Sequence, residues 1–559
     1  MKYIATDTSE FKNLIGGGYV YVDKTALLHR LVSGVDGTQF FISRPRRFGK
    51  SLMLSTLRHI FEGHRDLFRD LAIDKLDYGW KVYPVINLDM SDYDMEPGAK
   101  AFDTALRHDL LDRLAAAKIP CRKTSTASEL FAKLIQGVAA KSPEGQVVLL
   151  VDEYDHPLGG LLNERRQLLA MRRQLQGFYR TLKNNAGHIR FLMMTGVSKF
   201  SKMSVFSGLN NLCDLSMSPN YSSLFGYTHE EMRKYLQENV AAFAKHNGWT
   251  RARAFKALLA WYDSYRFSPS SDVRVVNPVA VGRALATGDL MAYWSMTGMP
   301  TLVLERLQAC GKLPADLDGE TAYPEDLDVC DAETLPYQSL LYQSGYLTIK
   351  DVVPETPVGS PAPRLKLVLG IPNLEVRESL RSAWWRTLLQ IDENDFTSLA
   401  NRAGRQLAAG DIDDLVCETL FSLYAKLPPT WTPKCEADAK RYFLLFMEMA
   451  GAKVRPEQPT LRGYADAIVE TSRAVYVFEF KYNRSAATAI RQIREKGYAE
   501  AYRADNRPVM LVGINFSSRT RNIEHPKIER LGVTKSLRVR IYKKKDSLTK
   551  QTSKRRKTK

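Results

Sequence analysis

The 559-residue chain has few cysteines and no long hydrophobic run, and both features limit the classes of protein to which it can belong. Its six cysteines are scattered, with no C-x-x-C pair and no histidine tract nearby. This spacing argues against structural zinc and predicts reduced, mostly buried thiols in a cytosolic protein. The longest apolar run, near Tyr442 to Ala452, is interrupted by Glu448 and is too short to cross a bilayer, and no signal peptide opens the chain. We therefore expect a soluble, cytoplasmic protein with no membrane partner.

The bulk composition is that of an ordinary globular protein, with 44% hydrophobic and 25% charged residues. A chain of this length is too long for one hydrophobic core, so we expect two to four domains. No internal repeat is present.

The net charge of +18 is distributed unevenly. Residues 538–559 hold eleven Lys or Arg residues against Asp546, a net charge of +10, and they contain little apolar material. We expect a disordered basic tail over 531–559. Such a tail can contact a nucleic-acid backbone, act as a nuclear import signal at Lys554–Lys557 if the protein enters a host cell, or simply solubilise the chain.

Residues 43–51, Ser-Arg-Pro-Arg-Arg-Phe-Gly-Lys-Ser, have the pattern of a phosphate-binding loop. A strand-like run, 39–42, precedes them, and helical spacing follows over 52–61. Backbone N–H groups and the helix dipole would face a triphosphate, Lys50 would reach its outer phosphates, and Ser51 would ligate Mg²⁺. The usual pattern places glycine where this chain has Arg44, and Gly49-Lys50-Ser51 alone also fits an ordinary helix start.

A second strand ending in carboxylates completes the pattern. Residues 147–151 are apolar and are followed by Asp152 and Glu153. Asp152 would hold the Mg²⁺ through water, and Glu153 would polarise the attacking water. A strand followed by an acidic turn is the alternative for this run by itself, but the two motifs together indicate an NTPase.

The spacing of further elements predicts the topology. A strand at 83–89 and a helix at 101–116 separate the two motifs, and a helix at 165–184 is followed by a strand at 189–194. In P-loop enzymes of the additional-strand class, this last strand carries a polar residue that senses the outer phosphate. Thr195 is the candidate for that role, with Ser198 next.

A second group of charged residues lies near the C-terminus. A helix over 436–450 precedes strands at 453–455, 463–469 and 474–481. Alternation places Glu479 and Lys481 on one face, and Asp466 can lie beside them on the neighbouring strand. Asp466 and Glu479 would ligate Mg²⁺ while Lys481 orients or deprotonates water, as phosphodiester hydrolysis requires. Glu-x-Lys also occurs on plain exposed strands.

Several segments together resemble a family of bacterial AAA-ATPase-like proteins with a C-terminal nuclease-like domain of the PD-(D/E)XK superfamily. They are Tyr21–Thr25, Arg44–Leu52, Val151–Asp155, Thr195–Phe200, Leu224–Thr228, Tyr346–Ile349 and Pro372–Arg377. In that family Arg-Pro-Arg-Arg-Phe-Gly-Lys-Ser is itself the usual loop, so Arg44 is the family's own variant. The resemblance implies a nucleotide-binding set of Arg46, Arg47, Phe48, Gly49, Lys50, Ser51, Leu52, Asp152 and Thr195.

The same resemblance extends to the C-terminal group. Gln492 and Tyr498 match the glutamine-tyrosine feature of the RecB-like branch, which adds Gln492 to the catalytic set, and Glu436 and Glu457 match further acidic positions. The family's Gly-Arg-x-Asp is Gly463-Tyr464-Ala465-Asp466 here, so one basic contact is missing. A closing strand is expected over 508–516.

Between the two groups the chain is helical and mixed. Thr228 and Glu231 form a capping box that begins a helix over 230–247, and a second helix is expected over 251–262. The resemblance implies a lid-like subdomain here. Residues 354–363 read as a loop between strands 346–353 and 365–369. The aromatic stretch 261–267 fits core packing better than base stacking, and helix 379–389, with Trp384 and Trp385, is expected to be core.

These observations predict an α/β protein with four regions: an additional-strand, AAA-like P-loop ATPase (1–227), a helical or mixed middle region (228–400), a restriction-endonuclease-like domain (415–530) and the basic tail. The expected function is ATP- and Mg²⁺-dependent action on nucleic acid, with DNA favoured over RNA. The alternatives are a nucleotide-gated module that binds DNA or a partner without cleaving it, and a secreted effector. An arginine finger, with Arg190 and Arg233 as candidates, would act between subunits only in an oligomer.

Overall fold

A computed structural model of the chain describes residues 1–6, 8–93, 98–161, 164–199, 211–294, 301–310, 312, 314–328, 336–356, 362–389, 393–460, 462–502 and 505–531. It divides into two compact units, Met1–Ala383 and Trp384–Lys559. The domain boundaries at 227, 400 and 415 stay predictions, and both Phe200 and the basic segment 532–559 lie outside the described residues.

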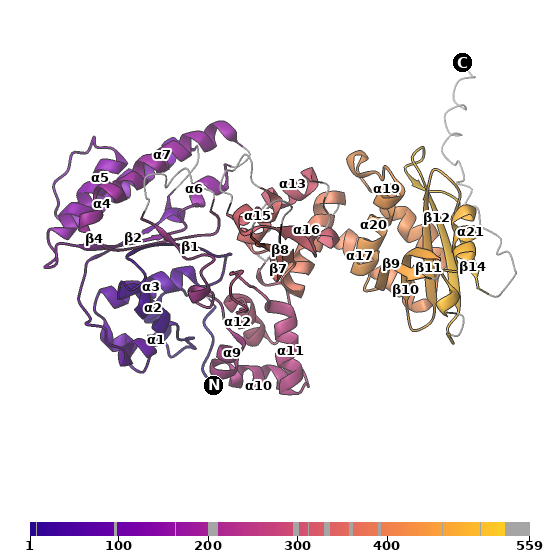
Figure 1. Cartoon of the computed structure of the whole chain (residues 1–559), viewed down its shortest axis with the longest axis horizontal. Coiled ribbons are helices and arrows are strands. Elements are labelled where there is room, and N and C mark those ends of the chain that lie inside the picture. Colours follow the sequence, from indigo (N-terminus) through magenta and orange to yellow (C-terminus); the bar gives the residue numbers. More distant parts are fainter. Residues whose placement is uncertain are drawn as a thin grey trace, which may run out of the picture. The chain divides into compact units, whose positions relative to one another are not determined.

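In the described part of the first unit, five parallel strands form one sheet in the order β2-β3-β4-β1-β5 (Figure 1). They are β1 (Gln39–Ser43), β2 (Val85–Asp89), β3 (Val147–Asp152), β4 (Ile189–Gly196) and β5 (Cys213–Asp214). β4 lies between β1 and β3, as the additional-strand class requires. Because parallel strands end at one edge of a sheet, Ser43 pairs with Gly196 and Asp89 with Asp152, which brings the predicted motifs together.

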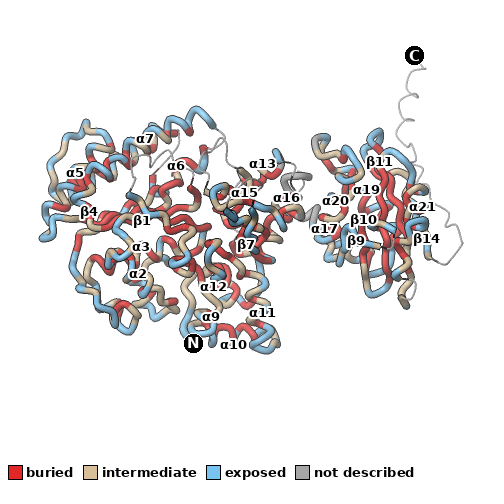
Figure 2. The backbone as a smooth tube through the Cα atoms, viewed as in Figure 1, coloured by how far each residue is buried: buried red, intermediate tan, exposed pale blue. Residues whose placement is uncertain are grey.

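Helices cover both faces of this sheet (Figure 1). α4 (Ala99–Ala116), α5 (Ala127–Ala139) and α7 (Arg165–Asn184) pack their apolar faces on Phe41, Leu149 and Leu192 in one core cluster. Alternate residues point to the other face, where Phe61 of α3 (Lys50–Phe61) contacts Phe191 with ring centroids 4.9 Å apart. α1 (Phe11–Gly16) and α2 (Thr25–Val32) lie on that side too. β1, β3 and β4 are buried along most of their length (Figure 2).

A helical cluster follows in the same unit. α9 (His229–Tyr235), α10 (Gln237–His246), α11 (Arg251–Tyr262) and α12 (Pro278–Thr287) share a core. The predicted capping box at Thr228 and Glu231 is confirmed, but the helix expected over 230–247 is two helices, because the chain leaves helical geometry at Leu236 (φ −114°, ψ 10°).

A small antiparallel sheet completes the first unit. In the described residues its strand order is β6 (Glu320–Ala322), β8 (Arg364–Gly370), β7 (Thr348–Glu355), next to α13 (Thr301–Ala309), α14 (Pro324–Leu327) and α15 (Tyr337–Ser344). The two strands predicted around residues 354–363 are confirmed. α16 (Leu374–Leu389) follows β8 and leads into the second unit.

The described part of the second unit contains a mixed sheet of six strands, ordered β13-β12-β11-β10-β9 with β14 also on β12. β9 (Lys453–Thr460), β10 (Gly463–Glu470) and β11 (Val475–Tyr482) are antiparallel, and β12 (Val509–Ser517) is parallel to β11. β13 (Asn522–Ile523) and β14 (Lys527–Arg530) run antiparallel to β12. Helices α20 (Glu436–Met449) and α21 (Ala486–Lys496) flank the sheet (Figure 1).

Other helices complete the second unit. α17 (Glu393–Ala409), α18 (Ile412–Asp414), a π-helical turn (Leu415–Leu420) and α19 (Phe421–Ala425) precede α20. Trp384 is buried against Trp431, with ring centroids 5.5 Å apart, as expected for core, while the side chain of Trp385 lies outside the described part. No helix among the described residues is both long and apolar enough to span a membrane.

The prediction of mostly buried thiols is wrong for the five described cysteines. Cys213, Cys310, Cys417 and Cys435 are exposed, Cys121 is half-buried, and none forms a disulfide. Cys213 lies on β5, the edge strand of the first sheet, and Cys435 is the N-cap of α20, positions that face outward. Cys330 lies outside the described residues.

Candidate functional site

The loop between β1 and α3 wraps around the N-terminus of α3. Gly49 has φ +92°, and a Cβ built there would meet nothing within 4 Å, so the space beside the loop is open. Lys50 is buried and its Nζ donates to the carbonyls of Arg44 (3.0 Å) and Pro45 (3.2 Å). Burial lowers the pKa of Lys50. The loop therefore holds the Lys50 ammonium over a concave stretch of backbone, as an anion-binding loop does.

A cavity of about 570 Å³ adjoins this loop. All of the predicted residues from Arg46 to Leu52 line it, and so does Glu153. Apolar residues from distant segments also line it, Val20, Leu224 and Pro278 among them. A cavity of this volume that combines backbone N–H donors with apolar side chains suits the phosphates and the base of a nucleotide.

Asp152 at the tip of β3 is tied directly to the loop. Its carboxylate accepts hydrogen bonds from Ser51 Oγ (2.6 Å) and from Thr195 Oγ1. Asp152 is buried, which raises its pKa, and it lines a neighbouring cavity of about 150 Å³ together with Ser51 and Asp89. The hydroxyl and the carboxylate are hard oxygen donors suited to Mg²⁺. Thr195 lines neither cavity and contacts Asp152, not open space.

Glu153 takes a left-handed backbone conformation (φ +47°) at the end of β3, which turns its side chain toward the cavity. His156, on α6 (His156–Gly159), lies with Nδ1 3.4 Å from Glu153 Oε2. This partner lowers the pKa of Glu153 and raises that of His156. The sequence analysis did not identify His156; its spacing of three from Glu153 was the available signal.

Arg44 occupies the position where glycine is usual in such loops, and its side chain turns inward. Its Nη1 donates to the carbonyls of Ser43 (2.8 Å) and Ser216 (2.7 Å), and the guanidinium lies over the ring of Phe267, 4.3 Å from the centroid. Phe267 and Tyr265 also pack on Phe48 of the loop. The aromatic stretch 261–267 thus provides packing for the loop, as expected.

Arg44→Gly should therefore destabilise the first unit, although it restores the usual loop pattern. Removing a buried stacked side chain leaves a cavity and loses packing, so we expect a loss of about 2–4 kcal/mol in the free energy of unfolding. Denaturant unfolding of the purified chain measures it, with the exposed-loop change Arg122→Gly as a control. An unchanged unfolding midpoint in Arg44→Gly would show that the side chain does not support the loop.

Residues far along the chain hold the outer side of the loop. Arg47 donates to the carbonyl of Tyr293, and Trp294 Nε1 donates to the carbonyl of Arg46 (3.2 Å). The backbone N–H of Trp294 in turn donates to Glu375 Oε1 (2.6 Å). Glu375 is fully buried and burial raises its pKa to about 8, while its Oε2 has no partner among the described residues.

The buried Glu375 carboxyl should make the stability of the first unit depend on pH. The folded state keeps its proton up to about pH 8, whereas the unfolded chain loses it near pH 4.5, so stability falls as pH rises through this window. We expect Glu375→Gln to match wild type near pH 5 and to be more stable by roughly 3 kcal/mol at pH 8. Thermal unfolding at both pH values tests this; parallel changes in the two proteins would contradict it.

The second site lies where β10 and β11 separate. Their pairing reaches Ala467 and Phe478, and beyond that point Asp466 Oδ2 accepts the backbone N–H of Phe480 (2.9 Å). Lys481 Nζ contacts Glu479 Oε1 (2.9 Å) and Glu436 Oε1 (3.1 Å). Glu436, Asp466 and Glu479 each offer an oxygen within 4.8 Å of the others.

Burial and the nearby Asp466 raise the pKa of Glu479 to about 7, and its Oε2 lacks a partner among the described residues. An orphaned buried oxygen beside two more carboxylates is costly unless a cation joins them, so this donor set fits Mg²⁺. Glu436, at the start of α20, had been noted only as a family position, and the structure brings it into the cluster.

The remaining predicted residues lie around this cluster. Gln492 Nε2 donates to the hydroxyl of Tyr498 (3.2 Å) and not to any of the three carboxylates in the described part of the chain. Glu457 pairs with Lys440 of α20, and Lys440 also contacts Asp466 (3.3 Å). Lys440 is a further residue that sequence patterns did not indicate, and it supplies a cation beside Asp466. Of the arginine-finger candidates, Arg190 contacts Val32 and Arg233 stacks on Phe255.

The parallel sheet with its loop and the mixed sheet with its carboxylate cluster define a chain that joins an AAA-like ATPase domain to a PD-(D/E)XK nuclease-type domain. A predicted AAA-ATPase family matches residues 6–206, and the PD-(D/E)XK nuclease superfamily matches residues 434–526. An uncharacterized protein in the vnfD 5' region of Azotobacter chroococcum mcd 1 is 32% identical over 529 residues, covering 92% of this chain and 96% of that protein. The chain belongs to this family of predicted AAA-ATPases with a C-terminal PD-(D/E)XK nuclease superfamily domain.

Proposed function

We propose that this protein binds and hydrolyses ATP in its first unit and carries a Mg²⁺-dependent nuclease in its second, with DNA as the favoured substrate. The observation that carries the nuclease proposal is the convergence of Glu436, Asp466 and Glu479 on one point, with Lys481 in contact with two of them. Carboxylates with a lysine are the groups that metal-assisted phosphodiester hydrolysis needs.

In the first unit, the loop from Arg46 to Leu52 binds the phosphates, and Lys50 leaves its two carbonyl partners to contact the outer ones. Ser51 and Asp152 hold the Mg²⁺, which neutralises phosphate charge when it is bound. Glu153, held by His156, orients the attacking water. Thr195 acts on Asp152 through its hydrogen bond and so positions that carboxylate, a role one step removed from sensing the phosphate directly.

In the second unit, Asp466, Glu479 and Glu436 hold the metal ion, whose chemistry is to lower the pKa of water and to stabilise charge on the phosphate. Lys481 orients the water through its contact with Glu479. Gln492 and Tyr498 limit one side of the site, and Lys440 contacts the substrate phosphate from α20. The match to the PD-(D/E)XK nuclease superfamily supports these proposed roles.

A second candidate is a nucleotide-gated module whose nuclease-like domain binds DNA or a partner without cleaving it. The observation that favours it is Tyr464, 65% exposed, at the family's arginine position. Calorimetric titration with Mn²⁺ separates the two proposals. A nuclease should bind the ion with heat that disappears in Glu479→Gln, whereas wild type without such heat would support the binding-only module.

A further inference from the structure

The helix that begins at Lys50 has a separate cluster of chemically active side chains at its C-terminal end. α3 stops at Phe61, and Gly63 (φ +75°) turns the chain back. His64 N–H then donates to the carbonyl of His59 (3.1 Å), and Gly63 N–H to that of Ile60 (3.2 Å). This is a Schellman turn, in which the residue after the glycine usually makes an apolar contact with the last helical turn. Here both contact positions are histidines.

The turn brings three donor atoms together. His59 Nδ1 lies 2.8 Å from His64 Nδ1. Glu62 Oε2 lies 3.6 Å from the first nitrogen and 3.4 Å from the second. One donor atom from each residue falls within 4.8 Å of the others. Two imidazoles and a carboxylate thus face one point from six consecutive positions of the chain.

Glu10 sets the orientation of the buried imidazole. Its Oε1 lies 2.8 Å from His59 Nε2, so that nitrogen carries the proton and Nδ1 presents its lone pair to His64 and Glu62. A carboxylate behind a histidine is the usual outer support of a metal-bound imidazole. His59 is 4% exposed, so its ring is fixed by packing as well.

The surrounding charges permit a cation at this point. Arg58 is paired with Glu10 (2.7 Å), Arg65 with Asp74 (3.1 Å), and Lys141 donates to the carbonyl of Ala117. Arg58 shares Glu10 Oε1 with His59, while Arg65 and Lys141 each have a partner outside the cluster. The C-terminal end of α3 adds partial negative charge, which favours a cation at this end of the helix.

We propose that His59, Glu62 and His64 form a binding site for a transition-metal ion of the zinc class. Imidazole nitrogens with one carboxylate suit Zn²⁺, whereas Mg²⁺ prefers oxygen donors alone. Three protein ligands leave a further position open, and Glu62 and His64 line a cavity of about 640 Å³, so that position faces solvent. α3 has twelve residues, which places this site about 18 Å from Lys50 at the other end of the same helix.

Zinc titration of the metal-stripped full-length chain, in competition with a chromogenic chelator, tests the proposal. We expect wild type to bind one more equivalent of Zn²⁺ than His64→Ala, whose side chain is 48% exposed and removable without a packing loss. The carboxylate cluster of the second unit is unchanged in both proteins, so the difference reports on the histidines. Glu10→Gln should keep the site but weaken it 10- to 100-fold.

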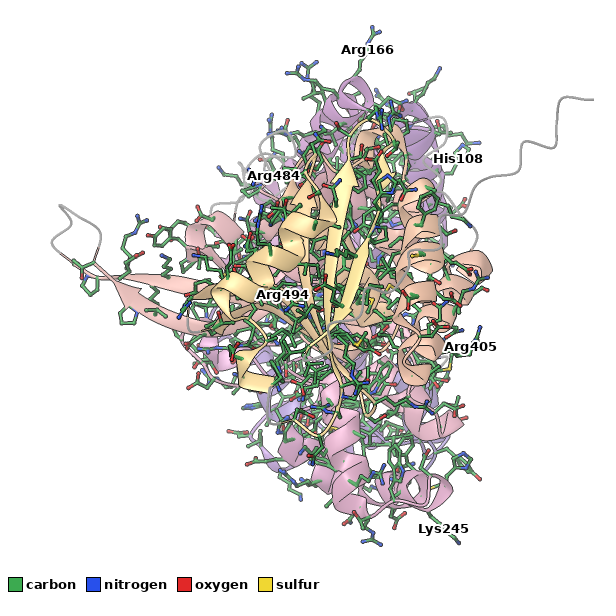
Figure 3. The ribbon with its side chains drawn as sticks, turned by 90° about the vertical axis from the view of Figure 1, so that its right-hand side faces the viewer. His108, Arg166, Lys245, Arg405, Arg484 and Arg494 are labelled. Carbon is green, nitrogen blue, oxygen red and sulfur yellow. The ribbon has the colours of Figure 1, made fainter. Side chains whose placement is uncertain are left out.

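The matched control is His108→Ala, since His108 lies on the outside of α4 (Figure 3). It should bind Zn²⁺ as wild type does. Unfolding temperatures with chelator should agree among wild type, His64→Ala and His108→Ala, and saturating Zn²⁺ should raise that of wild type more than that of His64→Ala. Equal stoichiometry and affinity in wild type and His64→Ala would overturn the proposal and leave the two imidazoles as a plain hydrogen-bonded pair.

Discussion

Lys50→Ala is expected to lower the affinity of the protein for ATP at least 100-fold, because hydrogen bonds from a charged donor contribute about 1.5–3 kcal/mol each and two are lost. Lys50 is buried at the head of α3 and its ammonium rests on the carbonyls of Arg44 and Pro45. Exchanging those neutral acceptors for phosphate oxygens gives the bound nucleotide its strongest ionic contacts. The alanine variant keeps the loop backbone but has no cation at position 50 to contact the phosphates.

Binding of a fluorescent ATP analogue, followed by displacement with ATP, measures the affinity. The matched control is Lys245→Ala, because Lys245 is an exposed lysine on α10 (Figure 3). Its affinity should equal that of wild type. If Lys50→Ala bound ATP as tightly as wild type, the loop would be an ordinary helix start and the ATPase assignment would fail.

Glu479→Gln is expected to lower the rate of Mg²⁺-dependent cleavage at least 100-fold. The change is nearly isosteric but removes a metal-binding charge, and the metal contributes several kcal/mol of charge stabilisation in the transition state. Among the described residues, it also leaves Glu436 as the only carboxylate in contact with Lys481. Loss of rate should therefore come with loss of Mn²⁺ binding.

Glu495→Gln provides the control, since Glu495 is an exposed glutamate on α21 in the same unit. Both variants are compared with wild type on single- and double-stranded DNA and on RNA, which also identifies the substrate. Equal cleavage rates in Glu479→Gln and wild type would mean that any observed nuclease lies elsewhere or is a contaminant.

Much of the fold follows from local sequence patterns. The helix over 165–184 and that over 251–262 match α7 and α11, because both have apolar periodicity and no internal proline. The two motifs predicted one nucleotide site for Lys50, Ser51 and Asp152, and the shared edge of the parallel strands brings Ser51 and Asp152 into hydrogen-bond contact. The predicted hairpin of two neighbouring strands likewise placed Asp466 beside Glu479.

Other features depend on contacts between distant segments. Trp294 and Glu375 support the loop from far along the chain. Trp294 lies 248 positions after Arg46, whose carbonyl it contacts. The direction of the Arg44 side chain depends on Phe267, and the place of Lys440 beside Asp466 depends on how α20 packs on the sheet. Side-chain periodicity cannot specify such pairs, because it fixes which face a residue occupies and not which segment covers that face.

The central claim is that one chain contains an ATP site and a metal-dependent nuclease site. A time course of supercoiled plasmid nicking tests it most directly, using wild type and Asp466→Ala, each with Mg²⁺ or EDTA and with or without ATP. We predict nicking only by wild type, only with Mg²⁺, and at a rate that changes when ATP is present. Nicking by Asp466→Ala at the wild-type rate, or no nicking by wild type on any nucleic acid under these conditions, would contradict the claim.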